Sequence, residues 1–121
     1  ISLLIEIICC NLILKPLVAR PRPFDINEGI SLLIARPDDY SFPSGHTGAS
    51  FAATAVLWRC DSKLKVSALI LAVLIAFSRM YLYVHYPSDI LTGMLLGTAA
   101  GIAGTVILER AERFMERRKT L

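Results

Sequence analysis

Four apolar stretches limit what this sequence can fold into. They cover residues 1–14, 47–58, 66–84 and 90–108 of a 121-residue chain that is 55% hydrophobic, with a mean hydropathy of +0.56. A soluble domain of this size could not bury that much apolar surface, so the composition favours a membrane protein. The third and fourth stretches match the ~20 residues that a membrane-spanning helix needs, whereas the second does so only if its helix begins near Ser44. We predict an all-α protein, an integral membrane helical bundle with about four transmembrane helices in a single domain over residues 1–121.

The fourth apolar stretch repeats a small residue at every fourth position. Gly93, Gly97 and Gly101 fall on one face of the expected helix, where the missing side chains let a second helix approach closely. We expect this face to contact a neighbouring helix of the bundle. The alternative is a glycine-rich helix without a particular partner.

The basic residues are unevenly divided between the two ends of the predicted spans. Alternating spans place eight of the thirteen on one side, namely Arg59, Lys63, Lys65, Arg110, Arg113, Arg117, Arg118 and Lys119. The other five are Lys15, Arg20, Arg22, Arg36 and Arg79. Because the more basic side usually faces the cytoplasm, we predict a cytoplasmic C-terminus and an outward-facing loop over residues 15–43. Within that loop, residues 28–35 are predicted to form a short interfacial helix.

The composition also argues against several kinds of site. The net charge of +3 is small and no basic stripe is interleaved with aromatic residues, so nucleic acid is not an expected partner. We interpret Cys9, Cys10 and Cys60 as small apolar residues, because no CxxC spacing is present. Asp38 and Asp39 are adjacent carboxylates without further metal ligands, and we interpret them as part of a solvated loop.

Several polar residues that are far apart in the sequence reach the same membrane face when the spans alternate. They are Lys15, Arg22, Ser44, His46, Arg79, His85 and Asp89. Ionisable groups at membrane depth are costly and by default mark a functional site. For Arg79 alone, snorkelling of the guanidinium to the interface is the alternative explanation.

His85 and Asp89 are four residues apart, with Pro87 between them. Proline suits the first turn of a helix, so Asp89 could reach back to one ring nitrogen of His85. The other nitrogen would then be free, as in an activated nucleophile or base. A simple helix cap by Asp89 is the alternative.

His46 follows Ser44 and Gly45 at the expected start of a helix, where exposed backbone N–H groups favour an anion. Arginine side chains match phosphate through their planar guanidinium groups. A helix N-terminus, three cations and two histidines together indicate a phosphate site, although the four letters PSGH alone would describe an ordinary helix start.

Three segments carry a recognisable family signature. They are KPLVARPRP at residues 15–23, PSGH at residues 43–46 and SRMYLYVHYPSD at residues 78–89. Their order and spacing resemble the type 2 phosphatidic acid phosphatase superfamily, the lipid phosphate phosphatases, which share this signature with vanadium haloperoxidases and glucose-6-phosphatase. The resemblance extends from Lys15 to the end of the last helix.

The resemblance implies a helical bundle that transfers a phosphoryl group through a phosphohistidine, without a metal or another cofactor. His85 would be the nucleophile and Asp89 its orienting partner. His46 would be the acid that protonates the leaving oxygen and later activates water.

The same resemblance assigns a phosphate clamp to the three basic residues of the motifs, Lys15, Arg22 and Arg79. The hydroxyl of Ser44 and the backbone amide of Gly45 would assist them.

The expected function is an integral membrane phosphatase, a phosphoric ester or acid anhydride hydrolase that acts on a lipid phosphate or diphosphate. The small size and the wording of the motifs look bacterial, so we expect a bacterial cytoplasmic membrane, and the charge bias described above predicts that the active site faces outward. They favour undecaprenyl diphosphate over phosphatidylglycerol phosphate and phosphatidic acid. The expected partners are this substrate and membrane lipids. A lipid phosphotransferase that uses an alcohol acceptor and a non-catalytic membrane scaffold protein are the alternatives.

Bacterial membrane members of the family commonly have six spans, and the motifs here fall at the ends of the third to sixth. We therefore expect that two N-terminal spans are missing from this chain and that it holds the last four.

Overall fold

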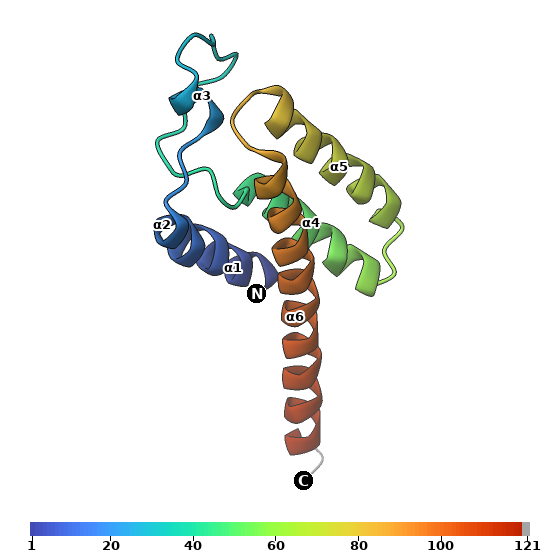
Figure 1. Cartoon of the computed structure of the whole chain (residues 1–121). Helices are drawn as coiled ribbons and strands as arrows, with labels where there is room; N and C mark the ends of the chain where they lie inside the picture. The colour runs from blue at the N-terminus through green and yellow to red at the C-terminus, as the bar shows by residue number, and fades with distance from the viewer. Residues whose placement is uncertain (120–121) are drawn as a thin grey trace.

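The computed structural model describes residues 1–119, and that part of the chain contains helices and loops but no strand (Figure 1). The helices are α1 (Ser2–Ile7), η1 (Ile8–Leu14), α2 (Lys15–Val18), α3 (Pro23–Ile26), α4 (Gly45–Arg59), α5 (Lys65–Tyr81) and α6 (Pro87–Lys119). The all-α prediction is confirmed.

The first apolar stretch forms one helical rod whose middle is wound more loosely. The segments α1, η1 and α2 follow one another without a break, and η1 is a π-helix. The rod ends at Ala19, where φ of 48° takes the backbone into the left-handed region. The chain then turns through Arg20–Arg22 into the single turn of α3.

Two of the predicted spans have the length and hydropathy to cross a membrane. They are Ser2–Ile26, which includes the turn after α2, and Pro87–Lys119. Helices α4 and α5 have only 15 and 17 residues, which is short or marginal against the ~20 of a typical span. The predicted number of four spans is therefore not confirmed.

The third apolar stretch differs most from its prediction. Its helix, α5, ends at Tyr81 and not at residue 84, and Tyr83 lies in the left-handed region with φ of 61°. The backbone carbonyl of Val84 accepts a hydrogen bond from Arg22 at 2.8 Å. The last apolar residues of the stretch therefore form a turn, which a hydropathy pattern cannot distinguish from a longer helix.

Helices α4 and α6 run parallel and pack with their backbones in contact. A Cβ added to Gly93 would lie 2.6 Å from the carbonyl oxygen of Ser44, and one added to Gly101 would lie 2.6 Å from that of Ala52. Between them, Gly97 contacts the backbone of Gly48. The predicted close approach at the glycine face is confirmed, and it fixes the start of α4 against the start of α6.

The remaining packing leaves much apolar surface uncovered. A small core of Phe51, Ala72, Ala76 and Ile90 joins α4, α5 and α6, whereas Leu71, Leu74 and Phe77 of α5 are more than half exposed. This outward apolar surface is what a lipid-facing helix presents. Figure 1 shows the last turns of α6 extending beyond the other helices.

The loop between α3 and α4 has no regular structure. Residues 28–35 form a turn and irregular backbone, so the predicted interfacial helix is wrong. Ile30 and Leu33 are exposed, and a short helix without tertiary packing is marginal.

Candidate active site

The turn between α5 and α6 buries the side chain of His85 beside that of Asp89. Asp89 is fully buried and His85 is 5% exposed. The Nδ1 atom of His85 lies 3.4 Å from Oδ2 of Asp89, close enough for an ion pair but without hydrogen-bond alignment. On the other side of the ring, Nε2 lies 3.3 Å from Nη1 of Arg22. The imidazole is thus held between a carboxylate and a guanidinium group.

Three further donors hold the Asp89 carboxylate. Oδ1 accepts a hydrogen bond from Nη1 of Arg20 at 2.8 Å, and Oδ2 accepts one from the backbone N–H of Tyr86 at 2.8 Å and one from the Ser41 hydroxyl. Arg20 also stacks on the Tyr86 ring, with 4.0 Å between the guanidinium carbon and the ring centroid. The sequence reasoning assigned no role to Arg20 or Ser41, although both lie within three residues of a motif position.

Burial lowers the pKa of His85 below the ordinary histidine value of 6.5. The Asp89 carboxylate opposes this effect and the Arg22 guanidinium adds to it. A neutral imidazole at pH 7 whose Nδ1 faces Asp89 can present the lone pair of Nε2 toward Arg22. That arrangement suits a nucleophile for a phosphorus atom bound at Arg22.

Arg22 and Lys15 lie next to the histidine and share one carboxylate. Arg22 is 3% exposed, and its Nη2 donates to Oδ1 of Asp39 at 2.5 Å. Lys15 is also buried, and its Nζ forms an ion pair with Oδ2 of the same side chain. Asp39 lies in an irregular loop with 52% of its side chain exposed, as predicted, but the sequence reasoning missed its bonds to these two cations.

Burial alone would raise the pKa of Asp39, but the hydrogen bonds from Lys15 and Arg22 outweigh it and hold the pKa below its ordinary value of 3.8. Asp39 is therefore ionised at neutral pH. It brings a negative charge to the two cations that the sequence assigned to a phosphate.

His46 and Arg79 lie near this cluster but are not bonded to it. His46 is exposed in the first turn of α4 and lies within electrostatic range of Arg79, His85, Lys15 and Arg22. It lines a hollow of about 330 Å³ together with Glu6, Ile7, Asn11, Lys15, Asp39, Gly45 and Ala49. Within residues 1–119, the only hydrogen bond from the half-buried Arg79 side chain goes from Nε to the Ser78 hydroxyl at 3.4 Å.

Ser44 and Gly45 occupy different positions from each other. The Ser44 hydroxyl is buried and caps α4, accepting a hydrogen bond from the backbone N–H of Thr47 at 3.4 Å. Gly45 lines the hollow beside His46, where a Cβ would lie 3.0 Å from Oδ1 of Asn11. Only Gly45 therefore faces the space in which a substrate could lie.

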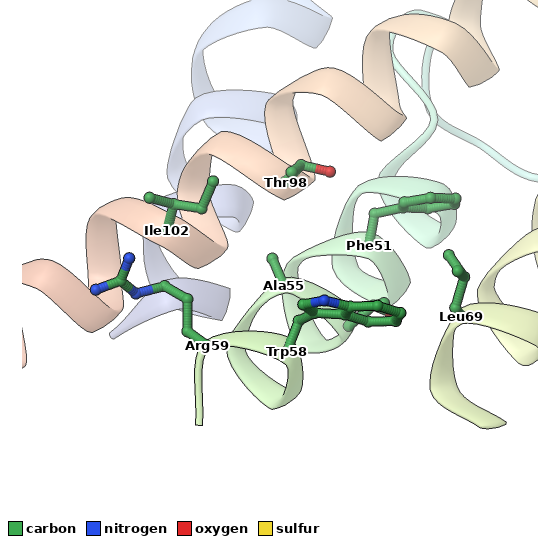
Figure 2. A pocket seen from close by; sticks show the side chains of 8 residues that line it. Phe51, Ala55, Trp58, Arg59, Leu69, Thr98 and Ile102 are labelled. Atoms are coloured by element: carbon green, nitrogen blue, oxygen red, sulfur yellow. The ribbon is translucent and has the colours of Figure 1, made fainter. Parts of the chain in front are cut away.

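Another hollow lies away from the histidines, between α4, α5 and α6. It measures about 380 Å³ and is lined by Phe51, Thr54, Ala55, Trp58, Arg59, Leu69, Thr98 and Ile102. Figure 2 shows the aromatic rings of Phe51 and Trp58 on the α4 side, with Arg59 at one end. Arg59 is paired with Glu109 at 2.9 Å. This lining contains no histidine, cysteine or carboxylate side chain, so we place the chemistry in the polar cluster.

No group of three or more histidine, cysteine, aspartate or glutamate side chains that could hold a metal ion occurs within residues 1–119. The charged groups beside His85 and His46 include three cations, Lys15, Arg22 and Arg79, and the carboxylates of Asp39 and Asp89.

Comparison with known proteins gives a consistent family. Residues 1–113 match the family model described as PAP2 superfamily. The chain is 39% identical over 85 residues to an undecaprenyl-diphosphatase of Sulfolobus acidocaldarius, covering 69% of this chain and 41% of that protein. It is 41% identical over 88 residues to the putative undecaprenyl-diphosphatase YbjG of Escherichia coli, covering 71% and 43%. The chain thus spans less than half the length of these relatives.

A solved structure shares the fold. The PAP2 type phosphatidylglycerolphosphate phosphatase from Bacillus subtilis superposes with a TM-score of 0.74 at 27% identity, over 93% of this chain and 58% of that one. The helix arrangement described above is therefore that of a transmembrane phosphatase of this family.

Proposed function

This chain belongs to the PAP2 superfamily, and we propose that the protein hydrolyses a lipid phosphate or diphosphate in a membrane through a phosphohistidine intermediate. The observation that carries the proposal is the position of His85. Its Nδ1 is 3.4 Å from the Asp89 carboxylate and its Nε2 is 3.3 Å from the Arg22 guanidinium. A nucleophile oriented on one side and facing a phosphate-binding cation on the other is what this chemistry requires.

In the first step, Nε2 of His85 attacks phosphorus, a P–N bond forms and the P–O bond to the lipid breaks. His46 gives its proton to the leaving oxygen. In the second step, His46 takes a proton from water, the oxygen of that water attacks phosphorus, and the P–N bond breaks to release phosphate. General acid–base catalysis of this kind typically contributes ~10²–10⁴-fold to the rate.

Lys15, Arg22 and Arg79 stabilise the charge that develops on the phosphoryl oxygens. Fixed cations in a partly buried site can supply stabilisation that a metal ion supplies in other phosphatases. Lys15 and Arg22 are both less than 10% exposed, which supports a preorganised clamp. Arg79 acts electrostatically on His46, and we assign it to the clamp as the third cation.

The lipid diphosphate that we favour is undecaprenyl diphosphate. Two of the relatives are named for that activity, whereas the solved structure is named for phosphatidylglycerol phosphate.

We also propose that α1–α2, α4, α5 and α6 all lie in the membrane, with the histidines at the outer face of a bacterial cytoplasmic membrane. Support comes from Lys15 and His46, which line one hollow, and from the backbone N–H of Ser44, which donates to the carbonyl oxygen of Asp89 at 3.1 Å. The uncovered apolar side chains of α5 support lipid contact for this short helix as well.

The test is phosphate release by the purified protein in detergent from a panel of undecaprenyl diphosphate, phosphatidylglycerol phosphate and phosphatidic acid. We expect turnover that is unchanged in chelator and is inhibited by vanadate, a mimic of five-coordinate phosphorus. Loss of turnover in chelator, restored by magnesium, would contradict the metal-independent mechanism. Absence of turnover on every lipid would contradict the phosphatase assignment.

A further inference from the structure

Asp39 binds the two cations that the proposed reaction needs for its substrate. Its two carboxylate oxygens are divided between them, Oδ1 on Nη2 of Arg22 at 2.5 Å and Oδ2 on Nζ of Lys15. Two oxygens of one phosphoryl group would use the same two donors. Asp39 therefore lies where it competes with a phosphate for the clamp.

The site does not depend on this carboxylate to hold Arg22. The Nη1 of Arg22 donates to the carbonyl oxygen of Val84 at 2.8 Å, and its Nε donates to the backbone carbonyl oxygen of Asp39 at 2.8 Å. These backbone contacts fix the plane of the guanidinium. The Nη2 donor would remain correctly oriented if the Asp39 side chain moved away.

The Asp39 side chain is also exposed enough to rotate into solvent. It is 52% exposed, whereas those of Lys15 and Arg22 are 10% and 4% exposed. A carboxylate in an irregular loop can rotate into water, whereas Arg22 keeps its two backbone hydrogen bonds and Lys15 stays buried beside it, ready to bind the anion that replaces Asp39. The mobile member of the trio is therefore the anion.

Charge favours the replacement of the Asp39 carboxylate by a phosphate. With Asp39 bound, the three side chains of Lys15, Arg22 and Asp39 together carry a net charge of +1. Arg79 is not bonded to either cation. A phosphate dianion or a diphosphate carries more charge than a carboxylate and could engage Arg79 as well. A multiply charged ligand would displace Asp39 more readily than a singly charged one.

We propose that Asp39 is an internal competitor that occupies the phosphate clamp, swings out when a substrate phosphate enters and returns to help expel the phosphate product. This inference rests on the proposed function and adds a specificity-determining residue to it. Only molecules in which Asp39 has left the clamp can bind an anion, so the apparent affinity for any anion is the intrinsic affinity multiplied by the fraction of such molecules. If Asp39 leaves the clamp in about a tenth of the molecules, anions bind roughly tenfold more weakly than they otherwise would.

The experiment compares Asp39→Asn with Asp38→Asn in purified protein. The two substitutions remove the same charge from adjacent loop positions, but Asp38 has no bond to the clamp. Binding of inorganic phosphate by calorimetry and inhibition by vanadate are measured for both. We expect roughly tenfold tighter binding of both anions to Asp39→Asn, and values close to those of the wild type for Asp38→Asn. Weaker or unchanged binding to Asp39→Asn would overturn the proposal, because Asp39 would then position the cations and not compete with their ligand.

A third variant tests whether the carboxylate of Asp39 is itself the competitor. Asp39→Glu keeps the carboxylate and is expected to bind phosphate within about threefold of the wild type. If Asp39→Glu instead matches Asp39→Asn, the competitor is not the carboxylate and the proposal fails. Should the Asn variant not be recovered in folded form, Asp39→Ser provides the same measurement. Because phosphate binding needs no turnover, tighter binding in a protein that hydrolyses no lipid would leave this inference standing while the proposed function fell.

Discussion

The two histidines differ in their surroundings, and this difference predicts different kinetic defects when each is replaced by alanine. His85 is buried between Asp89 and Arg22, whereas His46 is exposed at the start of α4 beside a hollow. His85→Ala should abolish both turnover and covalent labelling. With His46→Ala, His85 can still attack an activated aryl phosphate, because Lys15, Arg22 and Arg79 remain to bind the phosphate. The aryl leaving group needs no proton from His46. The phosphoenzyme should therefore still form in His46→Ala but break down slowly.

Rapid-quench trapping of phosphoenzyme from the aryl substrate measures this difference in both variants. A lipid diphosphate, whose leaving group is a fairly good anion, should suffer less from His46→Ala than a lipid monophosphate. Labelling that survives in His85→Ala and disappears in His46→Ala would mean that the two roles are reversed.

At this scale, spacing in the sequence predicted some contacts and missed others. The four-residue separation of His85 and Asp89 is local, so helix geometry was enough to predict that the two side chains meet. Asp39 joins Lys15 and Arg22 through contacts that span 24 and 17 residues across irregular loops. No periodic pattern encodes such a contact, and an exposed Asp-Asp pair is usually solvated. The roles of Arg20 and Ser41 at Asp89 were missed for the same reason.

The α4–α6 pair is the element on which the relative position of the histidines depends. His46 lies near the start of α4 and His85 just before α6, and the contact of Gly97 with the backbone of Gly48 sets the separation of the two helices. Gly97→Leu should therefore push the helices apart, cost about 1–3 kcal/mol or more in stability and reduce turnover sharply.

Ala99→Leu is the matched control, because Ala99 lies two residues away on the same helix and is exposed. We expect this variant to keep nearly normal thermal stability and turnover. Equal effects of the two substitutions on unfolding temperature in detergent would show that the glycine contact does not fix the helices.

The helices themselves were predictable where hydropathy and small-residue spacing agree, and less so at their ends. The glycine repeat predicted the close contact of α6, because a missing Cβ has the same consequence in any parallel or antiparallel pair. The end of α5 was misplaced because Leu82, Tyr83 and Val84 are as apolar as the helix before them. Their turn is closed by backbone hydrogen bonds such as that from the N–H of Val84 to the carbonyl oxygen of Arg79 at 3.3 Å, and it is tied to Arg22 by a long-range bond that no local pattern contains.

The whole molecule has two ends of different character. The Lys15 end of the first helical rod and the ends of α4, α5 and α6 that carry His46, Arg79 and Asp89 form one end. At the other, Arg59 pairs with Glu109, and the last turns of α6 carry Arg110, Arg113, Arg117 and Arg118. Because the more basic end of a membrane protein usually faces the cytoplasm, we predict that the histidines face outward.

Cys60 offers a built-in reporter for this orientation, because it is exposed in the loop between α4 and α5. In a variant that keeps Cys60 but has Cys9 and Cys10 replaced by alanine, an impermeant maleimide should label intact cells only after they are lysed. In a second variant, without native cysteines but with Asp38→Cys in the loop near the active site, the same reagent should label intact cells directly. Asp38 is suited to this because it is exposed and has no bond to the clamp. Phosphatase activity of both variants serves as the control for folding. The reverse labelling pattern would place the histidines in the cytoplasm, and a lipid of the outer leaflet could then not be the substrate.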